Sequence, residues 1–193
     1  MTRGRVLAIA VAVAAAAIVV TAIVTVAVRR RAAPRQATAG ATTAPAVAPA
    51  PGRKIKARLY YVSLDGTKLT AVDREVAYAD GTAAQAREIV NAQLAPIAAP
   101  LVSAIPPGTT LRALYLNDKG EAYVDLSRDA AMAHTGGTRD ELLTIYSIVN
   151  ALTSNLPAVT SVQILVDGKE VDTLAGHIDL RKPLEKNLAI SDP

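Results

Sequence analysis

Two histidines and the acids near them are the residues of this chain whose types and spacing could do chemistry. His134 follows Asp125, Ser127 and Asp129 within one short stretch. These are the side chains of a Ser-His-Asp triad, in which histidine takes a proton from serine. The G-x-S-x-G elbow that exposes a nucleophilic serine does not occur. We therefore interpret Asp125 and Ser127 as the end of a strand and His134 as a solvated loop residue.

The second candidate lies in "ILVDGKEVDTLAGHIDLRKPL", residues 164–184. His177 and Asp179 alternate with apolar residues, which places both on one face of an extended segment. One histidine and one aspartate make an incomplete metal set, and the chain has no cysteine. The residues instead favour a hairpin turn at Asp167-Gly168 followed by a short partner strand. The sequence predicts no catalytic residue, no metal site and no cofactor.

A third candidate is the "TGGT" run before Arg139, because backbone N–H groups at a helix N-terminus can hold an anion. Asp140 and Glu141 follow in the first turn and already offset the helix dipole. An ordinary helix start is the simpler interpretation. None of the three candidates predicts an enzyme.

The composition limits both the core and the partners. Phe, Trp and Cys are absent, so a core must consist of Val, Leu, Ile and Ala with tyrosine as the large filler, and disulfides are excluded. Residues 1–57 contain nine basic residues and no acid, whereas residues 58–193 contain twelve basic against 17 acidic residues, a net charge of −5. An acidic globular part predicts no nucleic-acid binding, despite the overall charge of +4.

The first 31 residues read as a membrane anchor with basic flanks. Val6 to Val28 is a run of 23 uncharged residues without Gly or Pro, long enough as a helix to cross a hydrocarbon core of about 30 Å. A cleavable signal peptide is the alternative, but its apolar region is shorter, about 7–15 residues. The sequence favours an uncleaved anchor that places the chain in the cytoplasmic membrane with a single pass. The flanking arginines lean slightly toward a cytoplasmic C-terminal side.

Residues 32–53 have the Ala, Pro and Thr content of an extended linker, and residues 54–193 have globular patterns. Alternation predicts strands in "KIKARLYYVS" and "LTAVDREVAY", and a hairpin joins residues 111–116 and 121–126 through a turn ending at Gly120. Two helices are predicted, one beginning at Thr82 and one at Thr138. Each begins with capping-box spacing, Thr82 with Gln85 in the first helix and Thr138 with Glu141 in the second. Residues 97–110 are predicted to be a loop.

The element order is therefore β-β-α-β-β-α-β-β. This order predicts an α+β domain with two helices packed on one face of a mostly antiparallel sheet, preceded by one transmembrane helix. The domain boundaries are 1–31 for the anchor, 32–53 for the linker and 54–193 for the globular domain.

The globular part resembles the GerMN domain family. The matching stretches are "LYYV", "LTAVDREV", "LVSAIPPGTTLRALYLNDKGEAYVDLS", "ELLTIYSIVNALTSNLPAVTSVQILVDGKEV" and "AGHIDLRKPL", in this order from Leu59 to Leu184. The resemblance implies an α/β domain tethered to the outer face of a bacterial membrane, related to sporulation and germination proteins, with no catalytic residues to transfer. It places the domain outside the cytoplasm, against the lean of the flanking charges. It also implies that "AGHIDLRKPL", residues 175–184, is the closing segment of the sheet.

The expected function is that of a membrane-anchored extracytoplasmic module acting through protein–protein contacts in the cell envelope, in sporulation, germination or envelope assembly. The expected partners are cell-envelope or membrane proteins, a second copy of the chain, and the membrane itself through residues 6–28. The alternative is a peptidoglycan-binding or cell-wall hydrolase-associated domain.

Overall fold

A long antiparallel hairpin opens the described part of the chain. The computed structural model describes residues 52–134 and 136–192. The predicted anchor and the predicted linker before Gly52 lie outside these residues, and no described helix has the length and apolar character needed to span a membrane. Strand β1 (Lys54–Val62) pairs along its whole length with β2 (Leu69–Ala77), with Leu59 opposite Val72.

The β1–β2 hairpin supplies the large side chains of the core. Ala57, Leu59 and Tyr61 are buried on one face, as the alternation predicts. Tyr60, which the same alternation groups with the charged residues, is buried as well, and its hydroxyl lies 2.9 Å from Ser154 Oγ. Tyrosine therefore fills the core as expected, and β1 is covered on both faces at this point.

The second sheet has five strands in the order β3-β4-β5-β6, with β7 also paired to β5. Its strands are β3 (Leu111–Leu116), β4 (Glu121–Leu126), β5 (Ser161–Val166), β6 (Lys169–Glu170) and β7 (Leu184–Glu185). The β3–β4 hairpin turns at Gly120, whose φ is 82° and whose Cβ, if present, would lie 2.7 Å from the Ala158 carbonyl oxygen. The predicted Asp167-Gly168 turn joins β5 to β6, with both residues at positive φ.

The α+β class is confirmed, and four of the five strand pairings among the described residues are antiparallel as predicted, but the prediction of a single sheet is wrong. The chain forms two separate sheets, and the central pair β4–β5 of the larger sheet is parallel. The connection between β4 and β5 contains a helix, and such crossover connections return the chain parallel to its start. The order also contains the short helix α3 (Asp129–Met132), which the sequence did not predict, and strand β7, which begins at the last residue of the predicted closing segment.

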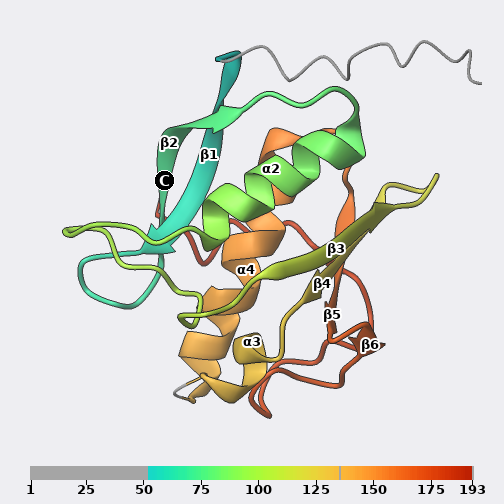
Figure 1. Cartoon of the computed structure of the whole chain (residues 1–193). Coiled ribbons are helices and arrows are strands. Elements are labelled where there is room, and N and C mark those ends of the chain that lie inside the picture. Colours follow the sequence, from blue (N-terminus) through green and yellow to red (C-terminus); the bar gives the residue numbers. More distant parts are fainter. Residues whose placement is uncertain (1–51, 135, 193) are drawn as a thin grey trace, which may run out of the picture. The chain divides into compact units, whose positions relative to one another are not determined.

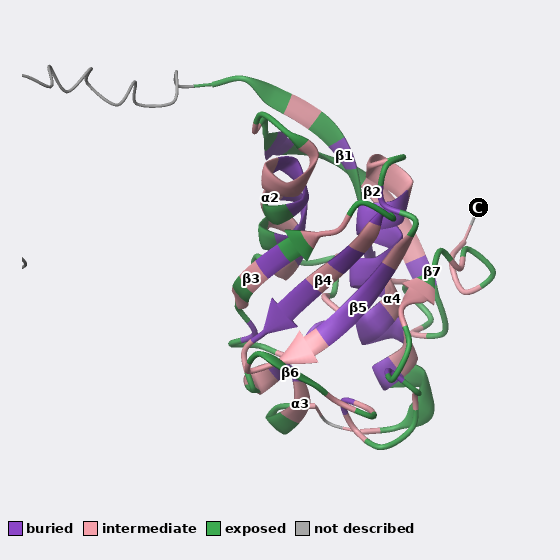
Figure 2. Cartoon of the chain, turned by 90° about the vertical axis from the view of Figure 1, so that its right-hand side faces the viewer, coloured by how far each residue is buried: buried purple, intermediate pink, exposed green. Residues whose placement is uncertain are grey.

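Helices α2 (Thr82–Leu94) and α4 (Thr138–Asn155) lie between the two sheets (Figure 1). They cover one face of the five-stranded sheet and pack against β1 on their other side (Figure 2). The predicted capping boxes are wrong, because the N-cap residues are Gly81 and Gly137 and neither helix has a side-chain cap. Gln85 and Glu141 lie in the first turn of their helices and bind segments outside the helix instead.

Amide side chains from both helices pair with the backbone of β1. The Tyr60 N–H donates to Gln93 Oε1 (2.9 Å), and Gln93 Nε2 donates to the Tyr60 carbonyl (2.7 Å). Asn155 makes the same two bonds with Arg58, both 2.8 Å long. These amides occupy the edge of β1 that faces away from β2, so no further strand can pair there.

The Gln93 contact predicts a large loss of stability on substitution. Gln93→Met keeps the size of the fully buried side chain but leaves the N–H and C=O of Tyr60 without partners. Each buried group left unsatisfied costs about 1–3 kcal/mol. We expect the free energy of unfolding to fall by about 2–4 kcal/mol, measured by urea denaturation followed by circular dichroism.

The matched control is Asn91→Met, which makes a comparable change at an exposed position of the same helix. We expect this control to change the stability little. Equal effects of the two variants would contradict a structural role for the Gln93 amide.

Candidate functional site

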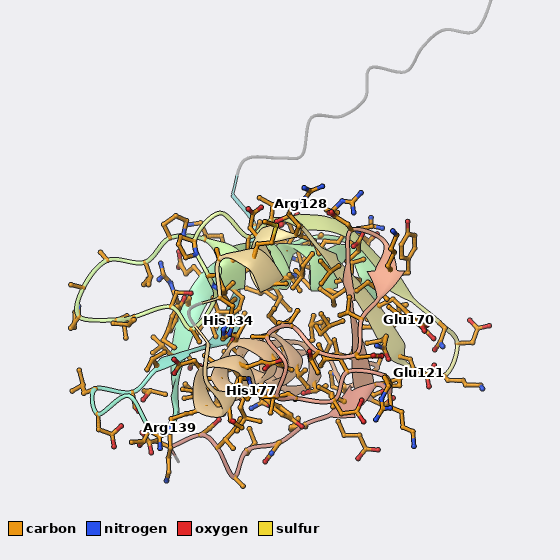
Figure 3. All side chains as sticks on the ribbon, turned by 90° about the horizontal axis from the view of Figure 1, so that it is seen from below. Glu121, Arg128, His134, Arg139, Glu170 and His177 are labelled. Atoms are coloured by element: carbon orange, nitrogen blue, oxygen red, sulfur yellow. The ribbon has the colours of Figure 1, made fainter. Side chains whose placement is uncertain are left out.

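The histidines and acids singled out by the sequence lie at separate places in the fold. Within residues 52–134 and 136–192, no group of three or more His, Asp and Glu side chains is arranged to hold a metal ion. Figure 3 shows His134 and His177 on separate loops, and each contacts the first two turns of α4.

His134 is bonded through both ring nitrogens. Its Nδ1 accepts a hydrogen bond from the Gly136 N–H (3.1 Å), which leaves Nε2 protonated in the neutral ring and 3.2 Å from Thr144 Oγ1. The side chain is half-buried rather than solvated, which corrects the loop interpretation. It borders a cavity of about 230 Å³ that is lined mainly by Ser103, Ala104, Ile105, Pro106 and Pro107.

The other residues of the imagined triad bind elsewhere. Ser127 Oγ donates to Asp129 Oδ2 (3.0 Å) and accepts from the Thr110 N–H (3.1 Å). Asp125 is buried and its Oδ1 accepts from the Gly168 N–H (2.7 Å), so it fixes the β5–β6 turn. No described contact joins either residue to His134. As predicted, Asp125 and Ser127 end a strand.

An ion-pair network surrounds the β5–β6 turn. Arg112 Nη1 lies 3.1 Å from Asp167 Oδ1 and 3.7 Å from Asp125 Oδ2, and Arg128 Nε lies 3.3 Å from Asp167 Oδ2. Two cations and two carboxylates neutralise each other here. The network therefore holds the turn.

Glu141 is the most constrained ionisable group that the structure describes. Its side chain is fully buried, and Oε1 accepts from the N–H groups of Leu174 (2.8 Å) and Ala175 (3.0 Å). Oε2 accepts from the His177 N–H (2.9 Å) and lies 3.1 Å from His177 Nδ1. The carboxylate thus ties the loop of residues 174–177 to the first turn of α4.

Burial and hydrogen bonding act on the pKa of Glu141 in opposite directions. Burial raises the pKa, whereas the N–H groups of Ala175, His177 and Leu174 and the His177 side chain lower it. The bonds prevail, and the pKa lies below the ordinary 4.5. Glu141 is therefore an ionised structural group near neutral pH, and not a proton donor poised for catalysis.

His177 and Asp179 do not form a pair. His177 contacts Glu141, while Asp179 binds Arg181 through its backbone N–H (3.0 Å) and guanidinium (2.7 Å). The Arg181 side chain and N–H hold the pKa of Asp179 well below its usual range. The predicted closing segment of the sheet, residues 175–184, is also wrong over most of its length, because only its last residue, Leu184, pairs with β5. The sequence did not identify Glu141 as the partner of His177.

The glycines before α4 form the start of the helix and no built anion site. Gly136 and Gly137 both adopt positive φ, and Gly137 is the N-cap. Asp140 and Glu141 occupy the first turn, as the sequence indicates. These two carboxylates interact favourably with the positive end of the helix dipole, so the helix start needs no bound anion.

The family model described as Germane, sporulation and spore germination, matches residues 58–172, which is more than half of the chain. The chain belongs to the Germane (GerMN) family. The family description names no catalytic activity. No curated protein matches the chain.

Solved structures show the same fold. The first GerMN domain of the sporulation protein GerM from Bacillus subtilis is 16% identical, with a TM-score of 0.53 over 69% of this chain and 98% of that domain. The tandem GerMN domains of the same protein give the same identity and TM-score but are matched over 46% of their length. A suspected lipoprotein from Clostridium perfringens is 24% identical over 69% of this chain and 88% of its own, with a TM-score of 0.49.

Glu141 gives a prediction about stability and its pH dependence. Glu141→Gln removes the buried charge that accepts three backbone N–H groups, and should lower the free energy of unfolding by about 3 kcal/mol near pH 7. The pKa is lower in the folded state, so the ionised carboxylate stabilises fully above about pH 4.5 and loses this effect as the pH falls. The difference in the free energy of unfolding between the unaltered chain and Glu141→Gln should therefore shrink below that pH.

Urea denaturation at a series of pH values measures this difference. Asp140→Asn is the matched control, since Asp140 is the exposed neighbouring acid in the same helical turn. A difference that stays constant from pH 7 to acid would contradict the role of the ionised carboxylate.

Proposed function

We propose that this Germane-family chain is a membrane-anchored module whose globular domain lies outside the cytoplasmic membrane and acts by contact with other envelope proteins. The family description supports a role in sporulation or spore germination. The apolar run from Val6 to Val28 supports the anchor, and the Pro- and Thr-rich residues after it support a tether.

The observation that favours contact over catalysis is that the reactive side chains bind the protein itself. Both ring nitrogens of His134 are engaged, and Glu141 accepts three backbone hydrogen bonds. A general acid or base must reach a substrate proton within hydrogen-bond distance. Because these polar groups already bond to loops of the domain itself, we infer that the domain acts through its surface.

Exposed apolar side chains on neighbouring loops support a contact function. Leu64 is 95% exposed in the β1–β2 loop, and Val102 is 57% exposed. The two loops adjoin, because the Val62 N–H donates to the Val102 carbonyl (2.9 Å). We include these adjoining loops in the proposed contact surface, because exposed apolar side chains are typical of binding surfaces.

The location can be tested with a single introduced cysteine, because the chain contains none. Asp118→Cys places a thiol in the exposed β3–β4 turn, away from the loops of Leu64 and Val102. In intact cells a membrane-impermeant maleimide should label this thiol to the same extent as in lysed cells, measured by a gel shift of the chain. Labelling only after lysis would place the domain in the cytoplasm and overturn this part of the proposal.

Partner capture tests the contact function. The full chain, cross-linked in cells and purified in detergent, should retain specific envelope proteins, and a chain lacking residues 6–28 should lose those that depend on membrane placement. Co-sedimentation with purified cell wall in the absence of other proteins would favour the peptidoglycan-binding alternative. Release of wall fragments that His134→Ala and His177→Ala abolish would overturn the non-enzymatic assignment.

A further inference from the structure

The free edge of β2 exposes backbone groups that could accept another strand. On β1, the backbone groups of Arg58 and Tyr60 point away from β2 toward Asn155 and Gln93. In an antiparallel ladder, residues directly opposite such positions also point outward. The register partners of Arg58 and Tyr60 are Asp73 and Ala71, so these residues direct N–H and C=O groups outward.

Both ends of this edge are already occupied by the chain itself. At one end, the Leu69 N–H donates to the Ile190 carbonyl (2.9 Å) and the Asp192 N–H donates to the Leu69 carbonyl (2.8 Å). At the other end, Gln85 Nε2 donates to the Ala77 carbonyl (3.0 Å). Between them the same alternation directs the backbone of Ala71, Asp73 and Glu75 outward. Among the described residues, nothing pairs with these outward groups.

A groove lies beside this free edge. It has a volume of about 710 Å³ and is lined by Arg58, Tyr60, Ala71, Val72, Asp73, Leu188, Ser191 and Asp192. Leu188 is 50% exposed at its rim. The groove lies over the face of the hairpin that carries Tyr60, Ala71 and Asp73, so a strand added to β2 would find space there for the side chains that point to the same face as Asp73.

The charges at the edge distinguish between occupants. Asp73 and Glu75 lie two residues apart on one face of β2, and both are exposed. A second copy that used all three free residues in an antiparallel pair would place Asp73 opposite its own counterpart, and like charges directly opposite destabilise a sheet. The edge therefore disfavours self-pairing and favours a strand that carries cations.

We propose that β2 accepts an extended segment of a partner protein that carries Lys or Arg at every second position. The cations would face Asp73 and Glu75, and the intervening neutral residues would face Val72 and Arg74 on the opposite side. On the other side of these acids, β1 presents Lys54, Lys56 and Arg58. The closest pairs, Lys54–Glu75 (2.8 Å) and Arg58–Asp73 (3.6 Å), are solvent-exposed and weak, so a cation on the added strand still gives each acid a further favourable contact. This inference rests on the proposed contact function and names its surface and the chemistry of the partner.

A short synthetic peptide that alternates valine and lysine is the direct probe. It is titrated against the full chain in detergent, and hydrogen–deuterium exchange is followed across residues 69–77. We expect saturable binding that slows exchange of the Ala71, Asp73 and Glu75 amides. A valine–glutamate peptide, and a valine–lysine peptide with N-methylated alternate amides, should each bind about tenfold more weakly.

Charge variants link the binding to the edge. Asp73→Lys should weaken binding of the valine–lysine peptide about fivefold, whereas Asp118→Lys, the same change in the exposed β3–β4 turn, should leave it unchanged. Circular dichroism verifies that both variants remain folded. Equal binding of the peptides, protection outside residues 69–77, or concentration-dependent protection without peptide, which marks self-association, would each overturn the inference.

The same variants separate this inference from the proposed function. If the unaltered chain captures envelope partners and Asp73→Lys captures the same partners equally well, the β2 site is wrong while the contact function stands. If the unaltered chain captures none, the proposed function itself fails.

Discussion

The hydrogen bonds from Gln93 and Asn155 to the backbone of β1 are the constraint on which the rest of the architecture depends. β1 is buried against two helices, and its outward N–H and C=O groups must still find partners. A neighbouring strand would supply them in a larger sheet, but α2 and α4 occupy that space. One amide from each helix donates and accepts in the geometry of a β-ladder. The fold therefore has two sheets with a helical layer between them.

Side chains also bond to backbone groups in other segments that lack strand pairing. Asn150 is fully buried in α4, and its amide donates to the Asn187 carbonyl and accepts from the Asn187 N–H. Glu141 holds the loop of residues 174–177, and Gln163 donates to the Leu180 carbonyl. The segment after β6 has almost no strand structure, so side chains of α4 and β5 replace the missing backbone partners. Polar residues that looked reactive in the sequence therefore serve as hydrogen-bond partners for the backbone.

The features that the sequence predicted are local ones. The turns at Gly120 and Asp167-Gly168 follow from positive φ angles that few residues adopt, and the strands follow from alternation. Pairing between strands depends on distant contacts, so the division into two sheets was not predicted. Gln93 stands within the apolar stripe of its helix, and a polar residue at such a position is a usable signal for a buried hydrogen bond. Glu141 had the spacing of a capping box, and only the fold shows that it reaches a loop far along the chain.

The occupied edge of β1 also determines where the smaller sheet can grow. Because Gln93 and Asn155 block one side, any added strand must pair with β2, between the contacts of the C-terminal segment and of Gln85. β1 begins directly after the residues predicted to form the tether, so a load applied between a strand on β2 and that tether would pass through the full β1–β2 ladder. The nine register pairs of this ladder and the two amide contacts would share such a load, which suits a surface that holds partners. The same bonds that close one edge of the hairpin thus leave β2 as the free edge of the smaller sheet.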